Sequence, residues 1–228
     1  MTLTALKGAT IAFDLDGTLV DTAPDLIGSL NAVLAEQGIA PVPVEAARAL
    51  VGRGARALIE RGFALTGRPL TEAEAPALVA RFIEIYRARI ADESTVFEGL
   101  EPALDLMAGA GAILCVCTNK PTGLSLLLLE KLGLLNRFAS VVGADAAPRP
   151  KPDASHLIHA VTTAGGDMAR AILVGDSATD VAAARAAKAP SIVVPFGYTE
   201  VPARDLGGDA FCARWSEVPL AAAGLLAR

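Results

Sequence analysis

Two carboxylates, Asp14 and Asp16, stand at the end of an apolar run in the stretch IAFDLDGTLVDT, residues 11–22. An extended chain alternates its side chains between two faces, so this spacing aims both carboxylates the same way and leaves Leu15 to face apolar neighbours. A single Asp at a strand end is more often a turn former or a helix cap. A catalytic interpretation of the pair therefore requires partners elsewhere in the chain.

Polar residues follow three later apolar runs at the matching position. Thr118 and Asn119 come after the second run, Lys151 lies a few residues beyond the third, and Asp176 directly follows the fourth, with Asp180 one helical turn later. Converging carboxylates raise one another's pKa values unless a cation or a lysine compensates them. Mg²⁺ does so, because it takes one or two carboxylates, water and phosphate oxygens. With a hydroxyl, a backbone amide and a lysine as donors, the set predicts a Mg²⁺-dependent phosphoryl-transfer site.

The elements that must position these residues are predicted to form a parallel sheet. Five apolar or β-branched runs are expected to be strands: TIAF (10–13), AILCVC (112–117), SVVGA (140–144), AILVG (171–175) and SIVVPF (191–196). Continuous apolar runs that alternate with helical patterns are typical of an α/β fold, a doubly wound parallel sheet covered on both faces. In such a sheet the carboxyl ends of the strands form the ligand crevice, and the polar residues fall at those ends.

About a hundred residues separate the first two strands, far more than a minimal crossover needs. The pairs Thr22–Asp25 and Thr71–Glu74 have the spacing of capping boxes, and apolar residues at helical spacing follow each pair. We therefore expect residues 20–92 to be an inserted small helical cap. Residues 1–19 and 93–228 are expected to be the Rossmann-like catalytic core.

Composition limits the other classes of function. The net charge of −5 comes without a basic cluster, which argues against a nucleic-acid partner. The apolar runs are too short for a membrane span, and the first ten residues lack the features of a signal peptide, so we expect a cytoplasmic protein without a membrane partner. Cys115 and Cys117 are predicted to be buried thiols, whereas His156 and His159 are expected on a polar helix face. The sequence indicates no oligomeric state.

Four motifs stand in order along the chain: DLDGT (14–18), TN (118–119), Lys151 with Pro152, and GDSATD (175–180). Over nearly its whole length the sequence resembles the haloacid dehalogenase (HAD) superfamily, in its phosphatase branch with a helical cap. The resemblance implies a Mg²⁺-dependent phosphomonoesterase that acts on a small phosphate monoester. It also implies that hydrolysis passes through an aspartyl phosphate.

The resemblance further implies a role for each matching residue. Asp14 attacks phosphorus, and Asp16 first protonates the leaving alcohol and then activates water. The Asp14 and Asp176 carboxylates and the backbone carbonyl of Asp16 hold Mg²⁺, while Asp180 orients a ligating water or Lys151. The residues implied to bind or approach the phosphoryl group are Gly17, Thr118, Asn119 and Lys151.

The substrate is indicated by a narrower resemblance. LVGRGARALIERGF in the cap, CTNKP, VGDSATDVAAARAA and FGY are similar to phosphoglycolate phosphatases, which implies hydrolysis of 2-phosphoglycolate to glycolate and phosphate. Within GRGAR, Arg53 and Arg56 are candidates to bind a substrate carboxylate. Lys188 and Glu98 stand where that pattern usually has Gly and Pro, and FEG also resembles phosphatases of amino-sugar acid phosphates such as N-acetylmuramic acid 6-phosphate.

Two further alternatives remain from the sequence. A phosphomutase on the same scaffold would return the phosphate to the sugar and release little inorganic phosphate. A non-catalytic phosphoacceptor would keep a long-lived aspartyl phosphate. The expected cap argues against the phosphoacceptor, because a cap excludes bulk water and selects substrate, which a signalling domain does not need.

Overall fold

The computed structural model describes residues 2–47, 51, 52, 54–199 and 201–227. Its six-stranded sheet is parallel throughout, in the order β5-β4-β1-β6-β7-β8. The strands are β1 (Thr10–Phe13), β4 (Ile113–Cys117), β5 (Ser140–Val142), β6 (Ala171–Gly175), β7 (Ser191–Val193) and β8 (Ala210–Phe211). The predicted α/β fold with a parallel sheet is confirmed. The two-residue strand β8 was not predicted, because so short a segment carries no periodic signal.

Nine helices accompany the sheet within the described ranges. They are α1 (Ala23–Glu36), α2 (Val44–Ala47), α3 (Ala55–Leu65), α4 (Ala75–Ala88), α5 (Leu100–Gly109), α6 (Thr122–Lys131), α7 (Ala154–Thr163), α8 (Ala178–Ala186) and α9 (Val218–Leu226). None of these helices has both the length and the apolar character that a membrane crossing requires.

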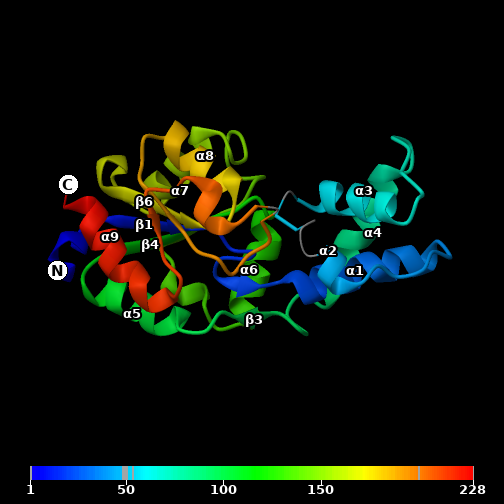
Figure 1. The fold of residues 1–228 in the computed structure, drawn as a ribbon, viewed down its shortest axis with the longest axis horizontal. Coiled ribbons are helices and arrows are strands. Elements are labelled where there is room, and N and C mark those ends of the chain that lie inside the picture. Colours follow the sequence, from blue (N-terminus) through cyan, green and yellow to red (C-terminus); the bar gives the residue numbers. More distant parts are fainter. Residues whose placement is uncertain (1, 48–50, 53, 200, 228) are drawn as a thin grey trace.

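The two faces of the sheet bury side chains of different size. Toward α7 and α8, the sheet presents small residues such as Ala12 and the buried thiol Cys115, which meet alanines of those helices. Toward α5 and α9, it presents Ile11 and Phe13, and Phe13 packs against Trp215 at a ring-centroid distance of 6.0 Å. The strands are therefore buried on both faces, as continuous apolar runs require (Figure 1).

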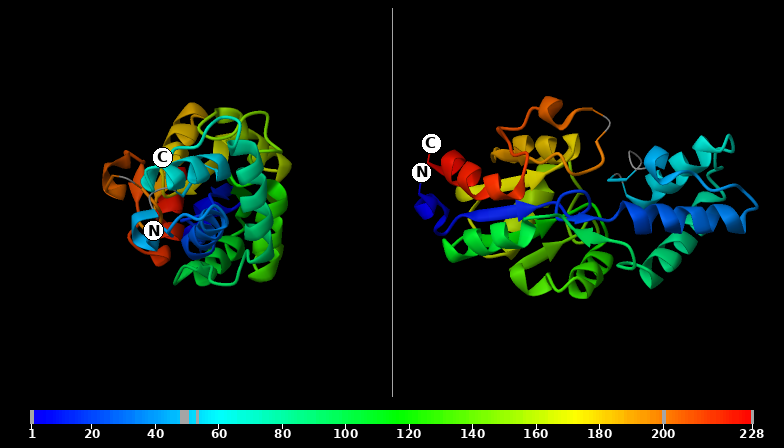
Figure 2. Two further views of the ribbon diagram at one scale, coloured as in Figure 1. Left: turned by 90° about the vertical axis from the view of Figure 1, so that its right-hand side faces the viewer. Right: turned by 60° about the horizontal axis from the view of Figure 1, so that its bottom comes forward.

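Helices α1 to α4 form a separate helical insert between β1 and β4 in the sequence. The insert lies beyond one end of the sheet, whereas both chain termini lie at the opposite end (Figures 1 and 2). Two short strands, β2 (Val20–Asp21) and β3 (Thr95–Val96), pair antiparallel where the chain leaves and re-enters the core. The insert is thus held to the core by two neighbouring linkers.

One of the predicted capping boxes is wrong. Thr22 precedes α1, but its backbone has φ −97° and ψ −4°, and its side chain makes no capping hydrogen bond. Instead the Thr22 hydroxyl donates to the Asp16 carboxylate at 2.7 Å. The second predicted pair does form, since Thr71 and Glu74 exchange hydrogen bonds in the turn before α4.

Asp25, the expected partner of Thr22, joins the two linkers instead. Its side chain is fully buried and accepts hydrogen bonds from the backbone N–H groups of Glu93 and Ser94 and from the Ser94 hydroxyl. The Arg89 guanidinium lies 3.6 Å from the same carboxylate. A carboxylate in the first turn of α1 therefore satisfies donors in the linker that follows the insert.

Replacing Asp25 with alanine is expected to lower the free energy of unfolding by about 3 kcal/mol, because it leaves the buried donors of Glu93 and Ser94 without their acceptor. Urea unfolding monitored by circular dichroism measures the change. Asp92→Ala is the matched control, since Asp92 is an exposed acid in the same linker. Equal stabilities of the two variants would contradict a linker-joining role for Asp25.

Candidate active site

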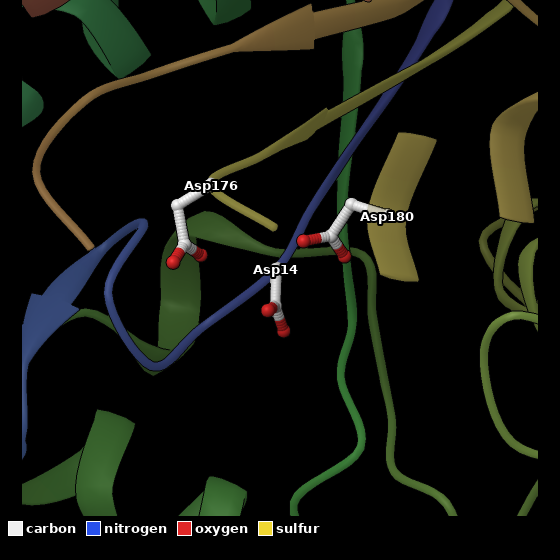
Figure 3. Close-up of side chains that lie close together, drawn as sticks. All are labelled: Asp14, Asp176 and Asp180. Atoms are coloured by element: carbon white, nitrogen blue, oxygen red, sulfur yellow. The ribbon is translucent and has the colours of Figure 1, made fainter. Parts of the chain in front are cut away.

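Three buried carboxylates meet at the carboxyl edge of the sheet, beside the insert. Asp14 follows β1, Asp176 follows β6, and Asp180 lies in the first turn of α8 (Figure 3). Each offers an oxygen atom within 4.8 Å of oxygens from the other two. The backbone N–H of Asp14 donates to the Val174 carbonyl at 2.9 Å, which extends the β1–β6 pairing as far as Asp14.

Lys151 joins two of these carboxylates. Its Nζ atom lies 2.9 Å from Asp14 Oδ1 and 2.6 Å from Asp180 Oδ1. Burial disfavours the ammonium charge, but the two carboxylates hold the pKa of Lys151 above its usual value. Burial raises the pKa of Asp14 to about 6 against the opposing effect of Lys151, and the nearby Asp180 and Asp16 carboxylates raise it further. Lys151 is therefore the main group that favours an ionised Asp14.

Asp176 is fixed through both of its oxygens. The Thr18 hydroxyl donates to Oδ1 at 2.8 Å, and the backbone N–H of Tyr198 donates to Oδ2 at 3.1 Å. Burial, followed by repulsion from Asp180 and Asp14, raises the pKa of Asp176 to about 8. Among the described residues, Lys151 forms ion pairs with Asp14 and Asp180, but no lysine or arginine forms one with Asp176.

Gly17 lies against the same carboxylate. Its φ is +81°, and a Cβ atom there would stand 2.8 Å from Asp176 Oδ2 and 2.9 Å from the Cα atom of Gly197. A side chain at position 17 would therefore be strained and would displace a candidate metal ligand. The expected approach of the Gly17 backbone to a phosphoryl group stays a prediction.

Asp16 faces different partners from those of Asp14. Its carboxylate accepts from Thr22 at 2.7 Å and pairs with Lys120 Nζ at 2.9 Å. Lys120 is nearly buried, and its ammonium lies 4.5 Å from the ring centroid of Tyr86 in α4. Lys120 was not predicted as a site residue, although it stands next to the TN motif in CTNKP.

Thr118 and Asn119 directly follow β4, as expected, but their side chains differ in what they contact. Thr118 is buried, and its hydroxyl accepts from the Lys120 N–H at 3.2 Å. The Asn119 side chain donates to the Lys151 carbonyl at 3.0 Å and accepts from the Lys151 N–H at 2.9 Å. The Asn119 side chain therefore holds Lys151, which leaves its backbone amide as the candidate phosphate donor.

Ser177 and Asp180 form a capping box at the start of α8. The Ser177 hydroxyl accepts from the Asp180 N–H, and the Ser177 N–H donates to Asp180 Oδ2 at 3.1 Å. Asp180 thus points one oxygen at Ser177 and the other at Lys151. The orienting role that the resemblance implies for Asp180 stays a prediction.

The FGY segment places Tyr198 between the core and the insert. The Tyr198 hydroxyl accepts from the N–H groups of Thr22 and Ala23 at 2.8 and 3.0 Å, and it donates to Asp21 at 2.6 Å. Since the Tyr198 N–H also binds Asp176, one residue connects the first linker to the acidic cluster.

One histidine assignment from the sequence is wrong. His156 is fully buried in α7, with both ring nitrogens within hydrogen-bond distance of backbone groups. His159 is partly exposed. The helical spacing was correct, but the start of α7 packs against the Lys151 segment and β5, which covers the first histidine.

The structure describes only one of the two candidate cap arginines. Arg53 lies outside the described residues. Arg56 is about half exposed and pairs with Glu60 at 2.6 Å and with Glu72 at 2.7 Å. Arg56 does not line the cavities next to the carboxylates. Its contact with substrate stays a prediction.

Two cavities border the carboxylates. One of about 50 Å³ lies between Asp14 and Asp16 on the core side and Leu58 and Tyr86 on the insert side. Lys120 is the one cation among the described residues that line it. A second cavity, of about 190 Å³, adjoins the same two carboxylates and Asp176. Both spaces share Asp14 and Asp16 on the core side and Val51 and Gly52 on the insert side.

Comparison with known proteins gives concordant matches. A family model described as haloacid dehalogenase-like hydrolase matches residues 11–194. A phosphoglycolate phosphatase from Caulobacter vibrioides is 54% identical over 225 residues, which cover 99% of this chain and 95% of that protein. One from Agrobacterium fabrum is 50% identical over 197 residues, with coverages of 86% and 84%. The crystal structure of a predicted phosphoglycolate phosphatase from Haemophilus somnus 129pt superposes with a TM-score of 0.84 at 25% identity and covers 93% of this chain and 96% of that one.

Proposed function

The chain belongs to the haloacid dehalogenase-like hydrolases, and from this we propose that it is a Mg²⁺-dependent phosphatase that hydrolyses 2-phosphoglycolate to glycolate and phosphate. The observation that carries the proposal is the setting of Asp14. This carboxylate is buried at a cavity wall, beside the Lys151 ammonium and two further acids, where a phosphoryl group and a cation both have partners. The names of the similar proteins support 2-phosphoglycolate as the substrate.

The acidic cluster fits a hard divalent ion. Oxygen atoms of the buried carboxylates Asp14, Asp176 and Asp180 lie within 4.8 Å of one another, and Lys151 is the ammonium that contacts Asp14 and Asp180. We propose that the Asp14 and Asp176 carboxylates and the Asp16 backbone carbonyl hold Mg²⁺, with Asp180 in support. When bound, the ion offsets the charge of the carboxylates and of the phosphoryl oxygens.

In the first proposed step, an Asp14 oxygen attacks phosphorus as the bond from phosphorus to the ester oxygen breaks. Asp16 gives its proton to the departing glycolate oxygen, which leaves an aspartyl phosphate and an Asp16 carboxylate. Lys151, the Thr118 hydroxyl and the Asn119 backbone N–H stabilise the charge on the transferring oxygens. Asp16 lines the same two cavities as Asp14, so both carboxylates border the space in which the ester would bind.

In the second step, Asp16 takes a proton from water as the water oxygen attacks phosphorus. The bond from phosphorus to Asp14 breaks and inorganic phosphate is released. The Asp14 carboxylate and the protonated Asp16 are thereby regenerated. The Lys120 ammonium and the Thr22 hydroxyl contact the Asp16 side chain and hold it in place for this proton transfer.

We propose that the inserted helices, residues 20–92, act as the substrate-selecting cap of the core formed by residues 1–19 and 93–228. Leu58 and Tyr86 of the insert close a cavity of about 50 Å³, which has room for about four water molecules. Phosphate release would distinguish the phosphatase from a phosphomutase, and turnover would exclude a phosphoacceptor. A cytoplasmic location stays a prediction.

A kinetic screen of phosphorylated metabolites tests the substrate. We expect kcat/KM to be highest for 2-phosphoglycolate and at least about a hundredfold lower for N-acetylmuramic acid 6-phosphate, a difference of about 3 kcal/mol in transition-state stabilisation. Comparable kcat/KM values across the panel would contradict the assignment. Arg53→Ala and Arg56→Ala, assayed with 2-phosphoglycolate and with a neutral aryl phosphate, test whether either arginine binds the substrate carboxylate.

The Mg²⁺-induced gain in thermal stability is expected to be larger near pH 8.5 than near pH 5.5. Without metal, the pKa values of Asp14 and Asp176 are raised to about 6 and about 8, so between about pH 4 and pH 8 the folded state binds more protons than the unfolded state. Stability therefore falls as pH rises through this window. Mg²⁺ binds the ionised carboxylates, so the ion is most effective where protons have left.

Thermal unfolding at the two pH values, with and without MgCl₂, measures this effect. Asp176→Asn should lose most of the Mg²⁺-dependent gain, because it replaces an anionic ligand with a neutral amide. Asp209→Asn is a matched control, since Asp209 accepts hydrogen bonds from Ser191 away from the cluster. A gain in Asp176→Asn as large as in the original protein would contradict the proposed ligand set.

A further inference from the structure

The backbone of Lys151 is held by a buried histidine that the proposed mechanism does not use. His156 Nδ1 accepts the Lys151 N–H at 3.0 Å, and His156 Nε2 lies 3.2 Å from the Val142 carbonyl at the end of β5. Because Nδ1 accepts and a carbonyl can only accept, the proton must reside on Nε2. The ring therefore bridges the end of one strand to the main chain of Lys151 in a single tautomer.

The charges around His156 favour the same neutral form. Burial and then the Lys151 ammonium lower the pKa of His156 to about 4, and the other titratable groups with an influence on it are His159 and Asp180. A protonated Nδ1 could not accept the Lys151 N–H. The neutral ring is thus the form that matches both contacts.

Lys151 depends on such support because its side chain reaches two carboxylates at once. Its Nζ atom lies within 2.9 Å of Asp14 and 2.6 Å of Asp180, and a lysine side chain has four flexible torsions. The position of its main chain therefore decides whether Nζ reaches both. Asn119 accepts the same N–H and binds the Lys151 carbonyl, so His156 is the second acceptor for one donor.

We propose that His156 is a positioning residue, which holds the Lys151 main chain so that the Lys151 ammonium bridges Asp14 and Asp180. The expected effect of His156 on turnover rests on the proposed function, whereas the hydrogen bonds of its ring do not. A histidine that only fills space in the core would need no particular partner for either ring nitrogen. Here each ring nitrogen instead has a backbone partner of the complementary kind, and one partner belongs to the lysine at the candidate catalytic centre.

Two substitutions separate positioning from packing. In His156→Asn, the amide oxygen stands near the place of Nδ1 and can accept the Lys151 N–H. In His156→Gln, the amide nitrogen stands near the place of Nε2 and can donate to the Val142 carbonyl, but the acceptor for Lys151 is lost. We expect kcat to fall about 30-fold in His156→Gln and less than about threefold in His156→Asn, since a displacement on the order of 1 Å at a catalytic group costs up to about 100-fold.

Inhibition by inorganic phosphate provides a second readout. We expect the inhibition constant to rise about tenfold in His156→Gln and to stay within about twofold in His156→Asn, because the Lys151 ammonium is a proposed phosphate contact. His159→Asn and His159→Gln, on the same helix, are matched controls and should retain full activity. Asn119→Ala combined with His156→Gln should lower kcat by more than the product of the two single effects, because both acceptors of one N–H are then absent.

The tautomer can be measured without any assay of activity. The chain has only two histidines, so the His159→Gln variant assigns both imidazoles in a ¹⁵N-labelled sample. At pH 7 we expect His156 to be neutral, with the proton on Nε2 and a bare Nδ1. If the unsubstituted protein had no phosphatase activity, the proposed function would be overturned. The tautomer measurement would still test the hydrogen bonds of His156.

Two results would overturn the positioning role. One is a proton on Nδ1 of His156. The other is an equal loss of activity in His156→Asn and His156→Gln that follows their loss of thermal stability, since packing alone would then explain both variants.

Discussion

Asp14→Asn is expected to lower kcat for 2-phosphoglycolate by at least about 10⁴-fold and to leave the protein folded. The amide oxygen is a poor nucleophile, and it cannot form the aspartyl phosphate through which hydrolysis is proposed to pass. The substitution is nearly isosteric, and Lys151 keeps Asp180 as its partner. The loss is therefore expected in the chemical step and not in the fold.

The same variant is expected to be at least as stable as the original protein in the absence of metal. Burial raises the pKa of Asp14 to about 6, so the ionised carboxylate opposes folding at pH 7, and repulsion from Asp180 and Asp16 adds to that cost. A neutral amide removes this repulsion. Steady-state kinetics and metal-free thermal unfolding on one preparation measure both effects.

Asp92→Asn, at an exposed acid of the linker, is the control for the loss of one negative charge. It should change neither kcat nor thermal stability. More than about 1% of the original activity in a pure Asp14→Asn sample would identify another group as the nucleophile.

The fold and the core of the site could be predicted because their signals are local. The runs TIAF and AILVG became β1 and β6 with the expected bounds, and Asp14 and Asp176 follow these strands directly. Neighbouring parallel strands end at one edge of a sheet, so the order of the strands suffices to bring their polar residues together. No side-chain detail is needed for that inference.

The contacts that adjust these groups could not be predicted, because they depend on the path of the chain between distant segments. Lys120 and Asp16 are 104 positions apart, and no local pattern indicates that they pair. His156 lies only five positions from Lys151, yet its partner is a backbone N–H, whose direction depends on the turn between them.

The capping boxes show how a local signal can fail. Ser177 and Thr22 have the same spacing to an acid three residues later, but Ser177 has φ −123° and ψ 160°, whereas Thr22 has φ −97° and ψ −4°. Only an extended residue directs its side chain at the N–H groups of the first turn. At Thr22 the Tyr198 hydroxyl accepts from the N–H groups of Thr22 and Ala23, and the Thr22 side chain donates to Asp16 instead. A tertiary contact from Tyr198, far along the chain, thus accompanies the loss of the capping box at Thr22.

Asp16→Asn is expected to separate the two proposed chemical steps. With 2-phosphoglycolate, kcat should fall about 10²- to 10⁴-fold, because a poor alkoxide leaving group needs a proton from Asp16. With p-nitrophenyl phosphate, the first step should still occur, because p-nitrophenolate leaves without a proton. The aspartyl phosphate should then accumulate, since no carboxylate remains to activate water.

Stopped-flow absorbance should therefore show a burst of about one p-nitrophenolate per active site, followed by a slow phase. The amide oxygen at position 16 can still accept from Thr22 and Lys120, so the surroundings of the residue are preserved. Thr22→Val is the matched control: it removes one hydrogen bond to Asp16 but keeps the acid, so we expect less than about a tenfold loss in kcat and no burst.

The burst is the result that distinguishes acid–base chemistry from mere support of the site. If Asp16 only oriented Asp14 or the metal ligands, the substitution would slow both steps, and p-nitrophenolate would appear slowly from the start. Steady turnover of p-nitrophenyl phosphate at the original rate would instead show that another group activates water. A burst with one substrate and a large loss with the other requires one residue that serves as the acid in the first step and as the base in the second.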